Sequence, residues 1–289
     1  MPPSHLSPGF TFSQASLQDY SDCARRFQLR YVLAIRWPQA KDEPAAERER
    51  RMQQGAAFHY LVHQHALGIP VDVLDPIADQ DTLRHWWRAY LNAPPNNLPS
   101  TVYRTEVQLA MPIGILFTDR LFDPDHPYRL AARYDLLAID PGRHAVIVDW
   151  KTGTKRPKRI WLESRWQTLV YRYVLAYAGT HLNNNVPIHP EQIEMVYWFA
   201  DFPAQPERLE YDTEQHKAAA QALTELITEI ETREGAEWPL ADDERKCKYC
   251  TYRTLCGRQS SQAEETPEEL EIDPFDFELD LEQIAEIAF

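Results

Sequence analysis

Two β-rich runs joined by a turn dipeptide constrain the fold of this chain more than any other local feature. The first run covers residues 128–139, the second covers residues 144–151, and Pro141-Gly142 lies between them. Runs of this composition separated by such a short turn predict an antiparallel hairpin. A chain with this hairpin at its centre is expected to be built around a β-sheet.

The other apolar residues alternate or recur at helical spacing, which predicts the remaining elements. Helices are expected over residues 15–35 (with Ser13 as N-cap), 48–67, 80–91, 159–178 and 213–233. Further strands are expected over residues 101–111, 113–121, 192–200 and 208–211. This order predicts one α/β domain over residues 10–258, with a loose segment 1–9 before it and a separate tail 259–289 after it. Most of the aromatic residues of segment 159–178 fit core packing better than base stacking; they are Trp161, Trp166, Tyr171, Tyr173 and Tyr177.

Three charged residues of the hairpin suggest chemistry. Asp149 and Lys151 are two positions apart, so they leave the same face of the strand, while Trp150 points to the opposite face. The short turn can bring Asp135 close to Asp149, and two neighbouring carboxylates repel unless a divalent cation lies between them. A hard cation with a nearby lysine suits phosphoryl chemistry. The alternative is a surface ion pair on an edge strand, because a motif as short as Asp-x-Lys often arises by chance.

The segment after the hairpin is strongly basic. Six cations fall within fifteen residues against the single acid Glu163; they are Lys151, Lys155, Arg156, Lys158, Arg159 and Arg165. This one-sided charge favours a track for phosphates, and the alternative is a solvated loop. Gln167 and Tyr171 follow four residues apart and so share one helix face.

The chain has four cysteines, of which Cys247, Cys250 and Cys256 lie within ten residues and Cys23 lies near the start. Four thiolates suit a [4Fe-4S] cluster or one zinc ion equally well by count. If Cys23 is the fourth ligand, the metal joins the two ends of the chain. In the alternative, Cys23 is buried and another residue completes a zinc knuckle.

The start of the chain lacks a secretory signal, so we expect a cytoplasmic location, where thiols are favoured over disulfides. No run of 18 apolar residues occurs, so we expect no membrane span. His59 and His63 could suggest a zinc pair, but a metalloprotease signature needs Glu after the first histidine, where this chain has Tyr60.

The formal net charge of −14 argues at first against nucleic-acid binding. Residues 260–289, however, hold eleven acids and no lysine or arginine, and residues 1–259 alone carry a charge of −3. The acidity therefore belongs mostly to the tail. This tail is expected to be solvated and flexible, or alternatively to dock on a partner protein or to cover the basic track as a mimic of DNA.

Taken in order, these residues resemble the RecB-like branch of the PD-(D/E)XK nucleases. The similarity is greatest to the iron–sulfur members, which include CRISPR-associated RecB-like exonucleases and AddB-type helicase–nuclease subunits. The matching motifs are the Ser13 to Tyr31 signature around Cys23, Gly55-x-x-x-His59, Arg133-Tyr134-Asp135, Asp149-Trp150-Lys151, Gln167-x-x-x-Tyr171 and the final cysteines. Two positions depart from the family pattern: Ala24 stands where proline is usual, and Ala132 where glycine is usual.

The resemblance implies a restriction-endonuclease-like α/β fold, in which helices flank a mixed central sheet and a metal cluster joins the terminal segments. It implies a metal-dependent DNA nuclease, and further an exonuclease acting on single-stranded or end-containing DNA in repair, recombination or defence. A catalytically silent DNA-binding module and a phosphatase or nucleotide hydrolase are the alternatives.

The resemblance also implies roles for particular residues. His59, Asp135, Asp149 and the Trp150 carbonyl would hold Mg²⁺ or Mn²⁺, with Glu106 as an accessory acid. Lys151 would orient the attacking water, and Gln167 and Tyr171 would align the DNA strand. The basic residues Lys155, Arg156, Lys158, Arg159 and Arg165 would contact DNA. Cys23, Cys247, Cys250 and Cys256 would bind the [4Fe-4S] cluster, with Zn²⁺ as the alternative.

Overall fold

A computed structural model describes residues 5–37, 43–115, 127–247 and 250–258. The acidic tail and part of the expected strand 113–121 lie outside these residues. Within that expected strand, Ile113–Ile115 forms a short 3₁₀ turn instead.

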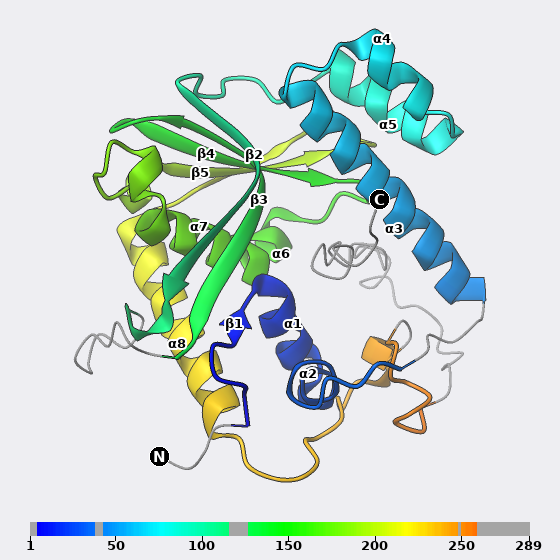
Figure 1. Ribbon diagram of the computed structural model, residues 1–289, viewed down its shortest axis with the longest axis vertical. Helices are drawn as coiled ribbons and strands as arrows, with labels where there is room; N and C mark the ends of the chain where they lie inside the picture. The colour runs from blue at the N-terminus through cyan, green and yellow to red at the C-terminus, as the bar shows by residue number, and fades with distance from the viewer. Residues whose placement is uncertain (1–4, 38–42, 116–126, 248–249, 259–289) are drawn as a thin grey trace.

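The described strands form a mixed six-stranded sheet (Figure 1). β3 pairs with both β2 and β4 in antiparallel register, β4 pairs with β5 in parallel register, and β6 closes the far edge against β5. The short β1 lies parallel to β3. The strand bounds are β1 (Thr11–Phe12), β2 (Val102–Pro112), β3 (Arg129–Asp140), β4 (His144–Lys151), β5 (Ile193–Phe199) and β6 (Glu207–Glu210).

The expected hairpin is confirmed. Asp140 pairs with His144 at the turn, and the ladder continues through Leu136 and Val148. Gly142 has a φ of +74°, a left-handed conformation that suits glycine in a tight turn.

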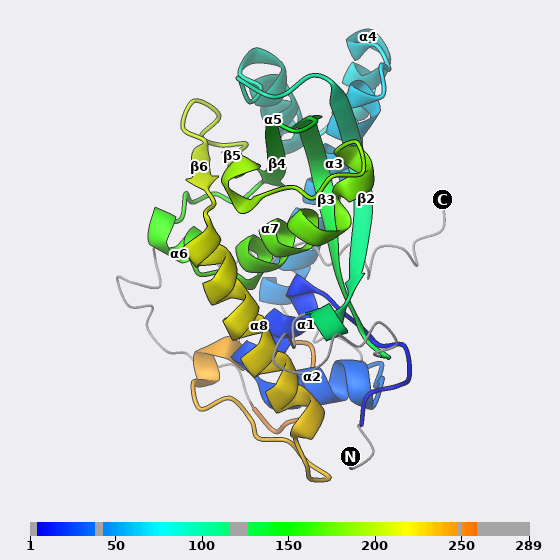
Figure 2. The ribbon, with the colours of Figure 1, turned by 90° about the vertical axis from the view of Figure 1, so that its left-hand side faces the viewer.

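Helices cover both faces of the sheet (Figures 1 and 2). Helices α7 and α8 share one core with β-strand residues such as Leu137 and Ile147, whereas α3 and α5 share a second core with Leu136 and Val148. The alternation of these residues shows the period of two that a strand imposes. The helix bounds are α1 (Gln14–Asp22), α2 (Ala24–Phe27), α3 (Glu43–Ala66), α4 (Val71–Leu74), α5 (Asp81–Asn92), α6 (Arg159–Glu163), α7 (Trp166–Ala178) and α8 (Thr213–Thr232).

Two helices that the sequence predicts as continuous are broken. The capping box at Ser13 starts α1 as expected, but the chain becomes extended at Cys23 (φ −162°, ψ 107°), restarts as α2 and ends in a π-helical turn over Gln28–Val32. The segment 159–178 divides into α6 and α7, because Arg165 adopts an extended conformation (ψ 142°) between them. The second break starts α7 one residue before Gln167.

Candidate active site

The charged residues of the hairpin lie together where the β3–β4 ladder stops: Asp149 and Lys151 are at the end of β4, Asp135 is in the middle of β3, and all three are buried. Asp149 and Lys151 leave the sheet on the same face, with the Lys151 Nζ 3.1 Å from the Asp149 Oδ2. Trp150 belongs to the core on the opposite face, as the sequence predicts. Its backbone N–H donates to the Asp135 Oδ2 at 2.8 Å, so the side chain of Asp135 connects the two strands at the site.

Helix α7 brings Gln167 into this group. The Gln167 Nε2 donates to the Asp149 Oδ1 at 2.7 Å, and its Oε1 accepts a hydrogen bond from the Lys151 Nζ at 2.9 Å. The amide therefore fixes both charged side chains. Each of the three residues is less than a tenth exposed, so water hardly reaches them. Hydrogen bonds to charged groups are among the strong ones in proteins.

Tyr171 shares the face of α7 with Gln167, as expected, and is equally buried. Its ring packs 5.1 Å from that of Tyr134, whose hydroxyl donates to the Tyr171 carbonyl oxygen. Tyr171 is 5% exposed, so its described contacts are those of a core residue next to the site.

His59 reaches the site from α3, on the other side of the hairpin. Its Nδ1 lies 3.2 Å from the Asp135 Oδ1, and its Nε2 lies 3.2 Å from the Trp150 carbonyl oxygen. Burial alone lowers the pKa of His59, but the carboxylates of Asp135, Glu106 and Asp149 outweigh it and raise the pKa to about 9. The Nδ1 contact lacks the alignment of a hydrogen bond, so a buried nitrogen faces a carboxylate without a proper bond.

Glu106 completes this side of the site from β2. The register pairs Thr105 with Leu136 and Val107 with Tyr134, which places Glu106 opposite Asp135, and its φ of +53° interrupts the ladder there. Such a conformation costs a residue other than glycine about 1–3 kcal/mol, and strain of this kind is frequent at functional sites. Burial and the neighbouring Asp135 raise the pKa of the Glu106 carboxyl.

His59, Glu106 and Asp135 each offer one ligand atom, and these three atoms lie within 4.8 Å of one another. One imidazole nitrogen and two carboxylate oxygens suit Mn²⁺ or Mg²⁺, and the poorly aligned His59 nitrogen fits the same assignment. The group differs from the expected ligand set because it includes Glu106, expected as an accessory acid, and does not include Asp149. Both carboxylates have protein partners: Arg133 binds the Glu106 Oε2 at 3.0 Å, and Gln167 and Lys151 bind Asp149.

The sequence profile of the PD-(D/E)XK nuclease superfamily matches residues 11–257. This match covers the sheet, the hairpin and every residue of the site described above. The chain belongs to the PD-(D/E)XK nuclease superfamily.

A search of curated proteins finds no match. Among solved structures, one described as "Crystal structure of SSO0001" aligns with this PD-(D/E)XK chain at 11% sequence identity and a TM-score of 0.36, over 87% of this chain and 88% of that chain. Nothing about the site follows from so loose an alignment.

Two arginines of the basic segment 151–165 of this PD-(D/E)XK protein form ion pairs within the protein. Arg156 and Arg159 both bind Glu207 on β6, and Arg159 also donates to the Glu163 carboxylate at 2.7 Å and to the Arg208 carbonyl at 2.8 Å. These two arginines therefore fasten the segment after the hairpin to the edge of the sheet. Lys158 is exposed, while Lys155 and Arg165 are half-buried.

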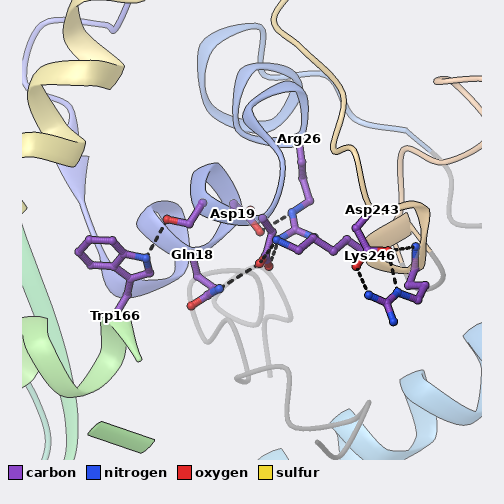
Figure 3. Close-up of polar contacts among 9 residues, drawn as sticks. Gln18, Asp19, Arg26, Trp166, Asp243 and Lys246 are labelled. Atoms are coloured by element: carbon purple, nitrogen blue, oxygen red, sulfur yellow. Dashed lines mark hydrogen bonds and ion pairs between the residues drawn. The ribbon is translucent and has the colours of Figure 1, made fainter. Parts of the chain in front are cut away.

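The two ends of the nuclease domain meet, as expected. Phe27 stacks on Trp238 with ring centroids 5.9 Å apart, and Gln28 accepts a hydrogen bond from the Trp238 backbone N–H. Figure 3 shows Arg26 and Lys246 turned towards the acidic side chains of α1, where Arg26 lies 2.7 Å from Asp19. Further on, the Tyr252 hydroxyl donates to the Ile35 carbonyl oxygen at 2.9 Å.

All four cysteines of the domain are free thiols of intermediate exposure. Cys250 follows Cys247 in a turn closed by a 3.1 Å backbone hydrogen bond. Burial raises the pKa of the Cys247, Cys250 and Cys256 thiols, and the charge of Cys23 adds to the rise at each of them. The four thiols therefore lie within electrostatic range of one another, a donor set that fits a metal–thiolate centre.

No helix of the described residues is long and apolar enough to cross a membrane.

Proposed function

We propose that this chain is a metal-dependent deoxyribonuclease that hydrolyses phosphodiester bonds at the end of the β3–β4 hairpin. The observation that carries the proposal is that the candidate cation ligands and the Asp149–Lys151 pair both adjoin Trp150. The Trp150 N–H binds Asp135 and its carbonyl faces His59, while Asp149 and Lys151 flank it in sequence. A candidate cation site and a buried lysine thus lie side by side, as phosphodiester hydrolysis requires.

His59, Glu106 and Asp135 would hold the cation, with Asp149 and the Trp150 carbonyl next to them. A bound Mg²⁺ or Mn²⁺ would neutralise charge on the phosphate and lower the pKa of a water molecule bound to it. Lys151 carries a positive charge at the end of a buried strand, where Gln167 and Asp149 fix its position. In our proposal this ammonium group orients the attacking water and offsets the charge that develops on the phosphate.

The finer activity follows from the motifs. We assign the chain to the RecB-like branch with an exonuclease mode, acting on single-stranded or end-containing DNA in repair, recombination or defence, in the cytoplasm. In support of DNA as the substrate, the segment between the hairpin and α7 carries exposed Lys158 and half-buried Lys155 and Arg165 in addition to Arg156 and Arg159, which bind Glu207. A protein partner would be held through the acidic tail 260–289.

We also propose that Cys23, Cys247, Cys250 and Cys256 bind a [4Fe-4S] cluster. In support, all four thiols are free and of intermediate exposure, and the charge of Cys23 acts on each of the other three. A single Zn²⁺ bound by the same thiolates is the alternative, and the iron and zinc content of the purified protein distinguishes the two.

The test is cleavage of end-labelled oligonucleotides by anaerobically purified protein. Single-stranded, blunt duplex and circular single-stranded DNA are compared with and without Mn²⁺, beside a small phosphodiester. We expect Mn²⁺-dependent cleavage of the linear single strand that Lys151→Ala abolishes without loss of DNA binding. Full activity in Lys151→Ala would remove the assigned role of this residue. DNA binding without cleavage in the wild type would indicate a silent module, and cleavage of the small diester alone would indicate another hydrolase.

A further inference from the structure

The short helix α6 exposes two large apolar side chains next to the candidate active site. Ile160 is 69% exposed and Trp161 is 45% exposed, and Ile160 is the most exposed large apolar side chain of the described residues. The sequence favours core packing for most of the aromatic residues of this region; Tyr171 and Tyr173 are buried as expected, whereas Trp161 is exposed. An exposed tryptophan leaves a large apolar surface in water that a ligand can cover.

Other residues of α6 are held against the rest of the protein. Leu162 is fully buried, and its carbonyl oxygen accepts a hydrogen bond from the Thr168 hydroxyl. Arg159 anchors the start of the helix to Glu207 of β6 at 3.0 Å, and its bond to Glu163 at 2.7 Å lies within α6. A ligand that binds the exposed face therefore causes little further loss of conformational entropy in α6, and such preorganisation favours binding.

Ile160 and Trp161 lie a few residues before Gln167 of the candidate active site. Trp161 precedes Gln167 by six residues, a span of at most about 22 Å even if the chain were fully extended. The chain between Trp161 and Gln167 is partly helical rather than extended, because it includes the end of α6 and the start of α7, so the two residues are closer than this limit. Figure 2 shows α6 beside α7, at the end where α7 begins.

The charge around the pair is positive. Lys158 is exposed just before it, and half-buried Arg165 lies after it. Arg165 is also in electrostatic range of Tyr197, whose hydroxyl donates to the Gln167 Oε1 at 3.3 Å. Glu163, the nearby acid, is paired with Arg159. Cations beside an exposed aromatic side chain are the combination by which proteins hold single strands, with phosphates on the cations and bases on the ring.

We propose that Trp161, with Ile160 beside it, is a stacking platform for an unpaired base of a DNA single strand that runs between α6 and the active site. This inference rests on the proposed deoxyribonuclease function. A base within a duplex is already stacked and paired, so its face is not available to Trp161. The platform thereby makes the protein selective for single strands and for the unpaired ends of duplexes.

The decisive experiment measures stacking directly in the binding of 2-aminopurine oligonucleotides. A series of single strands carries the fluorescent base at successive positions, and each is titrated with protein in a buffer without divalent metal. We expect quenching at one or two positions for the wild type and for Trp161→Phe. In Trp161→Ala the quenching disappears and the affinity falls about 5- to 100-fold. Leu67→Ala, which alters an apolar side chain that is 62% exposed after α3, is the matched control and leaves both readouts unchanged.

A second set of strands has an abasic position where quenching is greatest. If Trp161 stacks on that base, the abasic strand binds the wild type as weakly as the intact strand binds Trp161→Ala, and combining both changes weakens binding no further. Additive losses would overturn the proposal. So would an equal loss of affinity for single strands and blunt duplex, or unchanged binding by Trp161→Ala, which would leave α6 as a surface for a protein partner.

Results that refute the stacking platform can be told apart from results that refute the deoxyribonuclease function. If the wild type neither binds nor cleaves DNA, the deoxyribonuclease assignment falls and the platform falls with it. If the wild type cleaves single strands with Mn²⁺ but Trp161→Ala does so with the same KM and kcat, only the platform is refuted.

Discussion

Replacement of Gln167 by methionine tests how the site holds its lysine. The Gln167→Met side chain has nearly the same length but offers Lys151 no acceptor and Asp149 no donor. The native amide makes two hydrogen bonds to charged groups at 2.9 and 2.7 Å, and each is worth about 1.5–3 kcal/mol. Both partners are less than a tenth exposed, so water replaces the lost bonds poorly.

The direct contact between Lys151 and Asp149 at 3.1 Å survives this substitution and limits the damage. We therefore expect the free energy of unfolding to fall by about 3 kcal/mol, at the lower end of the sum of the two bonds. Urea denaturation followed by circular dichroism measures this value, and nuclease assays at saturating DNA measure the accompanying loss of kcat. A lysine that is no longer held in place is expected to lower kcat more than it raises KM.

A double-mutant cycle separates the bond from general damage to the core. It compares Gln167→Met, Lys151→Met and the protein with both changes, and we expect a coupling free energy of about 1.5–3 kcal/mol between the two positions. A coupling below about 0.5 kcal/mol would mean that Gln167 does not hold Lys151, and the positioning role assigned to this amide would then be wrong.

Three further changes probe other parts of the molecule. Glu106→Gln removes a carboxylate from the candidate cation site, so we expect the Mn²⁺ concentration for half-maximal cleavage to rise at least tenfold; unchanged Mn²⁺ dependence would exclude Glu106 as a ligand. Cys250→Ser is expected to remove the brown colour, the visible absorbance and bound iron of the protein and to lower its stability, and wild-type protein with one zinc and no iron would contradict the cluster. Burial lowers the pKa of His216, which stacks on Tyr173, so the unfolded chain takes up its proton first as the pH falls. Stability should therefore be lost as the pH falls below about 6.5, and His216→Gln should reduce that loss in urea titrations from pH 7.5 to pH 5.

Local rules were sufficient for much of the site. The period of two places Asp149 and Lys151 on one face of β4 and Trp150 on the other, and the four-residue spacing places Gln167 and Tyr171 on one face of α7. A turn dipeptide predicts the hairpin that brings Asp135 to them. Each of these predictions concerns residues close in sequence, whose geometry the backbone itself dictates.

What the sequence did not reveal depends on partners far away in the chain. The helical pattern continues through Cys23, and nothing local announces the break that lets Phe27 stack on Trp238. Glu106 reaches the site through a positive φ that its side chain does not favour. The basic segment loses two of its cations to Glu207, a residue about fifty positions later.

The meeting of the two chain ends also has a consequence for the order in which the protein is completed. Helices α1 and α2 are made first, yet Gln28 finds its partners at Ala236 and Trp238, more than 200 residues later. At 5–20 residues per second, the ribosome needs roughly 10–40 s to make that intervening chain. During this time Cys23 is present without the other three thiols. A centre built from all four thiols would therefore form only after Cys256 has been made, and a nascent chain stalled before residue 247 would hold the complete β3–β4 hairpin but only one of the four cysteines.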